Sequence, residues 1–359
     1  MKKLFKILTS ERVEYNKKSI KIFDMMRYSS HITNILESDK DNYIKNVCSF
    51  LEKKISDNTI FFIDDERFEP QYQKIELFFE CIKKIDSKHK NIIYIVKTEI
   101  FADYFEKYEI QNYIFEPLLE VINFYYGSFR IRKSLIGNKI KDVPFCSLNG
   151  TKNQVREFLL YRLNDYNLLP EGYVTACGQF FLDLNEDIRN NISKDKFFDK
   201  FYYDGNHKYH QDKNLVNILY IDKNIPGNIF LTVESFNYDK VEESLRPLYT
   251  EKTSTPFLTK RIPLIIGYKD IIQDLRIGGF DMFDDIINYE YDEIDHIDYQ
   301  KKIDLCIKNN LHILEHNDFY DNLEIDKRLE YNKKHYNIWV ENQILNFESN
   351  IEEKLKLFV

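Results

Sequence analysis

The segment Thr250-Glu251-Lys252-Thr253 combines side chains that can bind a phosphorylated ligand. A buried strand is expected before it, at Asn228–Val233, and a short helix directly after it. Open α/β folds bind ligands at the carboxyl ends of their strands, where helix N-termini offer free N–H groups to anions. We therefore expect an exposed Lys252 to bind a phosphate or diphosphate, and Glu251 to accept hydrogen bonds from ribose hydroxyls. A capped surface helix would show the same pattern.

Two further groups are candidates for the same site. Lys152 and Arg156 lie four residues apart at the start of a helix expected at Gln154–Asn164, so they share one helix face and can converge on one anion. Glu234 ends the Asn228–Val233 strand and would face the ligand. Solvated helix charges and turn residues also occur at such positions, so spacing alone leaves both alternatives open.

If the phosphorylated ligand is the donor of a group-transfer reaction, the site also needs a general base to deprotonate the acceptor. Asp64-Asp65-Glu66 directly follow a strand expected at Thr59–Ile63, which places their carboxylates at a strand end. Glu99 and Glu116 are secondary candidates, and turn-forming acids are the alternative for all of them. His207 and His210 lie close in sequence but lack a third ligand, so we expect no metal site.

Alternation of short apolar runs with longer segments of helical period predicts the elements that position these residues. The expected strands are Lys3–Leu8, Thr59–Ile63, Asn91–Val96, Val143–Leu148, Asn228–Val233 and Ile262–Ile266, and the expected helices are Asp41–Lys54, Gln71–Ile85, Phe101–Tyr108, Gln154–Asn164, Lys269–Arg276, Asp298–Asn309 and Leu323–Leu357. This order predicts an α/β protein of two Rossmann-like domains facing across a cleft, at 1–135 and 136–320, followed by a C-terminal helix within 321–359. No G-x-G-x-x-G follows any expected strand, which argues against a dinucleotide-dependent oxidoreductase.

Length and composition agree with this organisation. A chain of 359 residues suggests about two domains. The net charge of −8 provides no overall basic surface for nucleic acid, although basic groups can still cluster locally. Five scattered cysteines without a CxxC pair argue against structural zinc and a disulfide framework, and they fit a cytoplasmic protein. We expect no membrane span, because no run approaches about 18 apolar residues.

An ordered series of motifs resembles phage and bacterial glycosyltransferases that are distantly similar to the α-1,3-fucosyltransferase-type family. The motifs are Ser147-Leu-Asn-Gly-Thr-Lys-Asn-Gln-Val-Arg, Leu231-Thr-Val-Glu-Ser-Phe, Tyr249-Thr-Glu-Lys-Thr-Ser-Thr-Pro, Arg261-Ile-Pro-Leu-Ile-Ile-Gly, Leu275-Arg-Ile-Gly-Gly-Phe-Asp-Met-Phe and Ile287-Asn-Tyr-Glu-Tyr-Asp-Glu-Ile. They cover about the C-terminal 60% of the chain. The sequence departs from the family pattern in lacking a lysine before Pro256 and in having Lys152 where arginine is commoner.

The resemblance implies a GT-B fold and the transfer of a sugar from a nucleotide sugar to a hydroxyl-type acceptor. The acceptor would be a glycan, a lipid-linked sugar or a hydroxylated base of phage DNA. Residues 136–320 would then bind the donor, residues 1–135 the acceptor, and the C-terminal helix would cross back to the first domain as a strut. Basic groups, with Lys252 foremost, would stabilise the leaving diphosphate without a metal or another cofactor. A non-catalytic nucleotide-sugar binding module and a metal-dependent GT-A enzyme are the alternatives.

Overall fold

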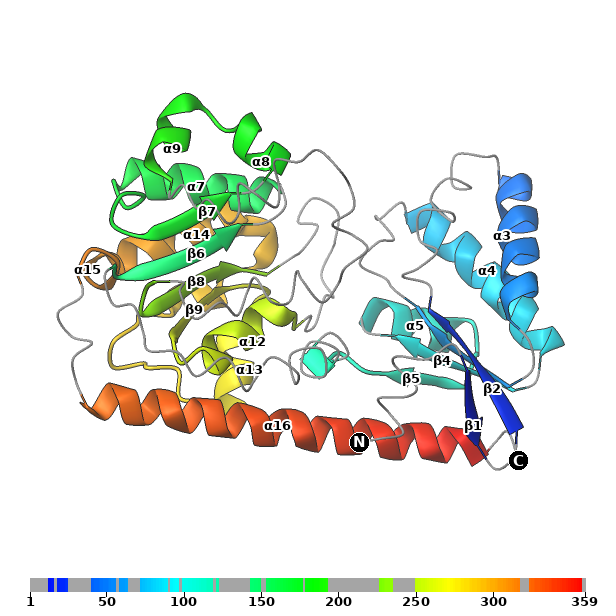
Figure 1. Ribbon diagram of the computed structural model, residues 1–359. Coiled ribbons are helices and arrows are strands. Elements are labelled where there is room, and N and C mark those ends of the chain that lie inside the picture. The colour runs from blue at the N-terminus through cyan, green and yellow to red at the C-terminus, as the bar shows by residue number, and fades with distance from the viewer. Residues whose placement is uncertain are drawn as a thin grey trace. The chain divides into compact units, whose positions relative to one another are not determined.

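The computed structural model describes residues 12–15, 18–24, 40–55, 58–63, 72–89, 91–96, 99–118, 121–122, 143–149, 153–176, 178–192, 226–234, 249–316 and 323–356. They form two compact units, each with its own sheet (Figure 1). The first unit takes the described residues of Met1–Asn123 and Glu341–Val359, and the second takes those of Phe124–Tyr238 and Tyr249–Val340.

The first unit has five strands in the order β1-β2-β3-β4-β5. They are β1 (Arg12–Tyr15), β2 (Lys18–Asp24), β3 (Thr59–Phe62), β4 (Ile92–Val96) and β5 (Tyr113–Phe115). β2 to β5 are parallel, and β1 pairs antiparallel with β2. The pairing of β1 with β2 was not expected from the sequence, and the strand predicted at Lys3–Leu8 lies outside the described residues.

In the described part of this unit, the helices that accompany the sheet are α3 (Lys40–Lys54), α4 (Tyr72–Lys88) and α5 (Glu99–Lys107). They confirm the three helices predicted here, with ends shifted by a few residues. Every side chain of β3 and β4 is buried, as is typical of parallel strands covered on both faces. Aromatic rings fill the core, where Phe79 stacks on Tyr104 with ring centres 5.0 Å apart and meets Phe105 edge-on at 5.1 Å.

The second unit contains four parallel strands in the order β7-β6-β8-β9. They are β6 (Phe145–Asn149), β7 (Tyr173–Ala176), β8 (Ile229–Val233) and β9 (Ile262–Ile266). β9 lies where the sequence predicted it, because a continuous apolar run marks a strand buried on both faces. β7 was missed, since Tyr173–Ala176 is too short to show a period.

The helices of the second unit are α7 (Gln154–Asp165), α8 (Gly178–Asp183), α9 (Glu186–Asn191), α12 (Glu251–Leu258), α13 (Ile271–Ile277), α14 (Tyr299–Asn309) and α15 (Leu311–Leu314), with 3-10 turns η4 (Glu290–Glu293) and η5 (His296–Asp298). α13 ends at the predicted glycine pair. Gly278 is its C-cap, and Gly279 has a φ of 89°, a left-handed conformation that glycine adopts without strain.

The last helix, α16 (Leu323–Leu355), is a single element of 33 residues, close to the predicted Leu323–Leu357. Its residues up to Val340 belong to the second unit, and those from Glu341 onward belong to the first. In the first unit, Lys354 Nζ donates to the Gln111 carbonyl at 3.1 Å. The role of this helix as a strut stays a prediction.

The described residues therefore form a mixed α/β protein with four parallel strands in each of two sheets. This arrangement is compatible with two Rossmann-like domains. In each sheet, the carboxyl ends of the parallel strands share one edge, and that edge positions most of the candidate site residues.

Candidate functional site

Glu234 lies at the carboxyl edge of the second sheet, directly after β8. Val233 is in register with Ile266 of β9, and the Glu234 N–H donates to the Ile266 carbonyl at 2.9 Å. This bond continues the ladder by one residue and brings the Glu234 side chain beside Gly267. A Cβ added to Gly267 would lie 3.6 Å from Glu234 Cγ and 2.9 Å from Ile271 Cδ1. Glycine thus leaves room for both side chains at this edge.

The Glu234 carboxylate binds the first turn of α12. Its Oε2 accepts a hydrogen bond from the Thr250 hydroxyl, and its Oε1 accepts from both the Thr253 N–H, at 3.0 Å, and the Thr253 hydroxyl. Thr250 is the N-cap of α12, and its Oγ1 accepts from the Lys252 N–H at 3.2 Å. A helix N-terminus attracts negative charge, and here the chain supplies a carboxylate of its own.

This arrangement changes how Thr250–Thr253 would bind an anion. Sequence analysis placed these residues before the helix, but α12 begins at Glu251, so Glu251 to Thr253 form its first turn. The backbone donor of Thr253 is already bound by Glu234. A diphosphate at this edge would therefore have to rely on side-chain charge more than on the helix N–H groups.

Lys252 is the basic residue of this turn, and it is only 5% exposed. The expectation that it would be exposed is wrong, because α12 packs against both β8 and β9 and so carries its first turn onto the sheet edge. The side chain of Glu251 lies outside the described residues. Pro256, inside α12, has no N–H to donate to the carbonyl of Lys252 four residues earlier.

Arg156 lies at the start of α7, the helix that follows β6. Asn153 is the N-cap, and its side chain accepts from the Arg156 N–H at 2.8 Å. Arg156 is 4% exposed, so it is a buried charge near a carboxyl strand end and not a solvated helix charge. Asn149 ends β6, and its Nδ2 donates to Ser147 Oγ at 3.2 Å. Lys152 lies outside the described residues, so its convergence with Arg156 stays a prediction.

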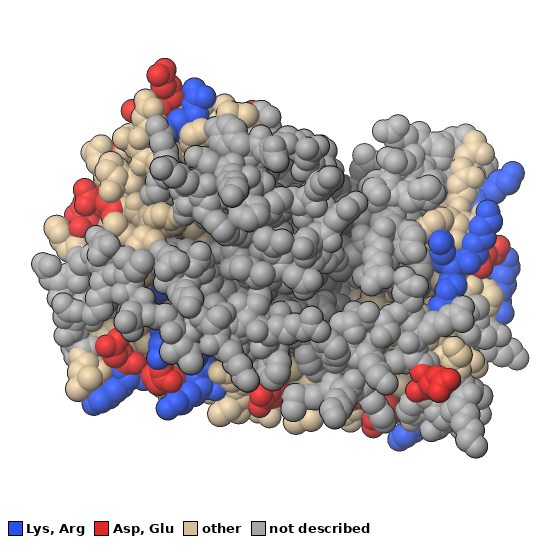
Figure 2. All heavy atoms as spheres, viewed as in Figure 1, with Lys and Arg blue, Asp and Glu red and all other residues tan. Residues whose placement is uncertain are grey.

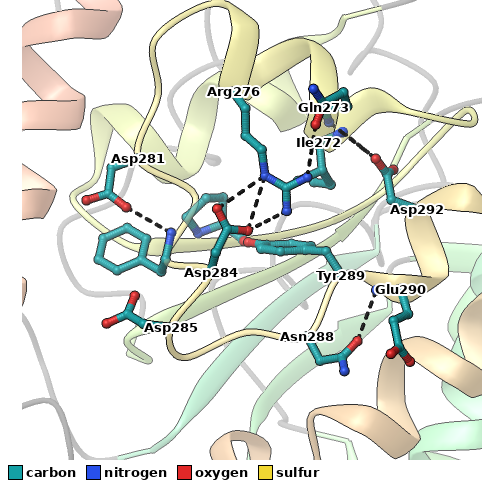
Figure 3. A network of polar contacts seen from close by, with 12 residues as sticks. Ile272, Gln273, Arg276, Asp281, Asp284, Asp285, Asn288, Tyr289, Glu290 and Asp292 are labelled. Carbon is teal, nitrogen blue, oxygen red and sulfur yellow. Dashed lines mark hydrogen bonds and ion pairs between the residues drawn. The ribbon is translucent and has the colours of Figure 1, made fainter.

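A second polar network surrounds the neighbouring helix α13 (Figure 3). The Asp292 carboxylate accepts from the Ile272 N–H at 2.9 Å and from the Gln273 N–H at 3.3 Å, and so caps this helix as Glu234 caps α12. Burial raises the pKa of Asp292 to about 6. At the other end of α13, Arg276 forms an ion pair with Asp284.

Two tyrosines from the same segment bind β9, the last strand in the sheet order. Tyr289 donates its hydroxyl to the Pro263 carbonyl at 2.7 Å, and Tyr291 donates to the Ile265 carbonyl at 3.0 Å. An edge strand otherwise leaves such carbonyls without partners. Tyr289 and Tyr291 are two residues apart, as are the Pro263 and Ile265 carbonyls that they bind. Alternate carbonyls of a strand point to the same side, so this matching spacing is the sequence signal that could have identified the contact.

Lys302 of α14 is completely buried and binds three backbone carbonyls. Its Nζ donates to Tyr268 and Ile294 at 3.0 Å each and to Asp292 at 3.4 Å, and it lies 4.0 Å from Asp292 Oδ1. Burial lowers the pKa of Lys302 to about 8, although the Asp292 carboxylate opposes that shift. Lys302 fixes the segment after β9, beside Gly267, and sequence analysis did not identify it.

The predicted base candidates belong to the first unit. Asp64, Asp65 and Glu66 lie outside the described residues, as does the side chain of Glu99, so their roles stay predictions. Glu116 follows β5 at the carboxyl edge of the sheet and is 6% exposed. It accepts from the Leu118 N–H at 3.2 Å, and burial raises its pKa to about 7, a value suited to proton transfer at neutral pH.

Comparisons of the chain with protein-family models, curated proteins and solved structures find no match. Across the described residues, no group of three or more His, Cys, Asp or Glu side chains is arranged to hold a metal ion, and His207 and His210 fall outside them. None of the helices in the described part of the chain is both long and apolar enough to cross a membrane.

Proposed function

We propose that this protein is a glycosyltransferase of the GT-B type that moves a sugar from a nucleotide-sugar donor to a hydroxyl-type acceptor. The observation that carries the proposal is the position of Lys252. This lysine lies in the first turn of α12, at the carboxyl edge of the second sheet, on a turn that Glu234 fixes through Thr250 and Thr253. The motif resemblance supports the same assignment.

The chemistry needs positive charge where the donor breaks. As the bond between sugar and diphosphate breaks, the leaving diphosphate gains negative charge, and a fixed cation at that position lowers the barrier. Lys252 supplies this charge, with Arg156 and Lys152 assisting, while Glu251 binds the ribose. Glu234 acts as a positioning residue, because its carboxylate binds the first turn of α12 and its N–H binds β9. No metal is required in this mechanism.

A base must also deprotonate the acceptor hydroxyl. Asp64, Asp65 and Glu66 remain the first candidates. Glu116 is the second, because a buried carboxyl with a pKa near 7 holds and releases a proton at neutral pH. The acceptor is a glycan, a lipid-linked sugar or a hydroxylated base of phage DNA.

The test measures donor hydrolysis and transfer with a panel of nucleotide sugars, alongside nucleoside diphosphate binding by calorimetry. Lys252→Ala should lower turnover by about 10²–10³, as expected for the loss of one charge-stabilising donor. Lys301→Ala is the control, because Lys301 is exposed on α14. Turnover should persist in excess chelator.

Each outcome has a distinct meaning. Diphosphate binding that depends on Lys252, without hydrolysis or transfer of any donor, would identify the non-catalytic binding module. Equal turnover and affinity in Lys252→Ala and wild type would refute the site. Activity that chelator abolishes and manganese restores would favour a metal-dependent GT-A enzyme, with Asp64 and Asp65 as metal ligands.

A further inference from the structure

Two cysteines far apart in sequence meet where α3 packs against α4 in the first unit. Cys48 lies on α3 and Cys81 on α4, both are free thiols, and they are in hydrogen-bonding contact. Cys81 Sγ also lies 3.6 Å from the Ile44 carbonyl oxygen, which is a second acceptor for its single proton. Ile44 lies one turn before Cys48 on the same face of α3, so this contact independently places the Cys81 thiol beside Cys48.

The two thiols have different surroundings. Cys81 is fully buried, whereas Cys48 is partly exposed at the edge of the helix pair. Lys84 and Lys88 of α4 face Cys48, together with Glu52 of α3, which forms an ion pair with Lys88. Figure 2 shows basic side chains, which on these two helices are all lysines, with acidic side chains among them.

These surroundings divide the roles between the thiols. The hydrogen bond from Cys81, assisted by the two lysines, lowers the pKa of Cys48 to about 7. The same hydrogen bond, together with burial, raises the pKa of Cys81. Cys48, the more exposed of the two, is therefore the thiol that ionises first, and the thiolate is the reactive form. Cys81 stays protonated beside it.

We propose that Cys48 and Cys81 form a peroxide-sensitive dithiol that oxidises to a disulfide joining α3 to α4. The Cys48 thiolate attacks one oxygen of hydrogen peroxide, the O–O bond breaks, and the departing hydroxide takes up a proton to become water. Cys48 is then a sulfenic acid. The Cys81 sulfur attacks the Cys48 sulfur, the S–O bond breaks, and the leaving hydroxide takes the Cys81 proton as a second water. In sum, two thiols and one peroxide give one disulfide and two waters.

The second unit supplies matched controls in the same chain. Cys146 is fully buried in β6, donates to the Ile229 carbonyl at 3.5 Å, and has its pKa raised to about 11 by burial. Cys306 of α14 is also fully buried, and burial raises its pKa. Both should resist peroxide under conditions that oxidise Cys48.

The experiment treats the full-length native protein with hydrogen peroxide. Remaining thiols are then alkylated, and proteolytic peptides are mapped by mass spectrometry. We expect a 48–81 disulfide that dithiothreitol reverses, with Cys146 and Cys306 still reduced. Before oxidation, Cys48 should alkylate about threefold faster at pH 7 than an ordinary thiol of pKa near 8.5, because its larger thiolate fraction outweighs the lower nucleophilicity of that thiolate. In Cys81→Ser, oxidation should stop at a Cys48 sulfenic acid that dimedone captures.

Other results would overturn the proposal. The proposal is wrong if Cys48 is no more reactive than Cys146. It is also wrong if, in the wild-type protein, Cys48 oxidises to sulfinic acid or forms a disulfide with a second chain while Cys81 stays reduced. In Cys48→Ser, oxidation of Cys81 at the wild-type rate would also contradict the assigned order. Circular dichroism checks that each variant is folded, and the disulfide map of the wild-type protein needs no variant.

Discussion

The buried lysine of α14 makes the stability of the second unit depend on pH in a direction that can be calculated. Lys302 is completely buried, and its pKa falls from 10.5 to about 8 on folding. A lowered lysine pKa means that folding disfavours the charged form. Stability is therefore higher above pH 10.5 and is lost as pH falls through 8, because the unfolded chain binds the proton more tightly.

The size of the effect follows from the shift. Each unit of pKa corresponds to about 1.4 kcal/mol, so the full shift contributes about 3.4 kcal/mol, of which about 2 kcal/mol falls between pH 7 and pH 9.5. Lys302→Met removes the titrating group and keeps a side chain of similar length. The wild-type protein should therefore gain about 2 kcal/mol of unfolding free energy relative to Lys302→Met over that interval.

Urea unfolding at several pH values between 7 and 9.5 measures this difference, with a spectroscopic signal followed for the transition of the second unit. Comparison with the variant cancels the contributions of titrating groups that do not interact with Lys302, whereas Asp292 does interact with it. Lys301→Met, at an exposed neighbouring position, should follow the wild-type profile. Parallel profiles for wild type and Lys302→Met, within about 0.5 kcal/mol, would show that folding does not disfavour the Lys302 charge and would refute the reasoning.

Three further predictions concern the same unit. The pKa of Asp292 rises from 3.8 to about 6 by burial, so stability should fall by about 2 kcal/mol as pH rises from 4 to 6, and Asp292→Asn should lack this fall in urea titrations. Glu234→Gln should lower the unfolding free energy by about 1.5–3 kcal/mol, because a charged acceptor of the first turn of α12 is lost. A loss no greater than that of exposed Glu171→Gln would contradict this role. Tyr291→Phe should cost about 1 kcal/mol in thermal unfolding by leaving the Ile265 carbonyl without its donor, and an unchanged Tm would count against it.

Much of the fold was predictable because its strands are buried on both faces. Ile262–Ile266 is a continuous apolar run and forms β9 with the predicted bounds. The strand Arg12–Tyr15 was not predictable in this way, since two of its four residues are charged and its pairing with β2 depends on tertiary contacts. Propensity is a weak guide for such short strands.

The candidate site was predictable only in part. Threonine is a residue type that favours the N-cap, and Thr250 is the N-cap of α12, although the sequence placed all of Thr250–Thr253 before the helix. The contact between Glu234 and Thr253 joins residues 19 positions apart and depends on the end of β8 lying beside α12. The buried position of Lys302 had a signal, since it lies four residues before Cys306 on the apolar face of α14, but its charge favoured a surface position.

The composition of the first unit has a consequence for how the chain folds as it is synthesised. Its sheet comes from the start of the sequence, but residues from Glu341 onward, which include the buried Phe347 and Ile351, also belong to it. The chain of the second unit lies between these two parts. Domains usually fold in order as they leave the ribosome. Here, the first unit begins to fold early but cannot be completed until the whole of the second unit has been synthesised. The apolar surface of the first unit that α16 covers stays uncovered until then.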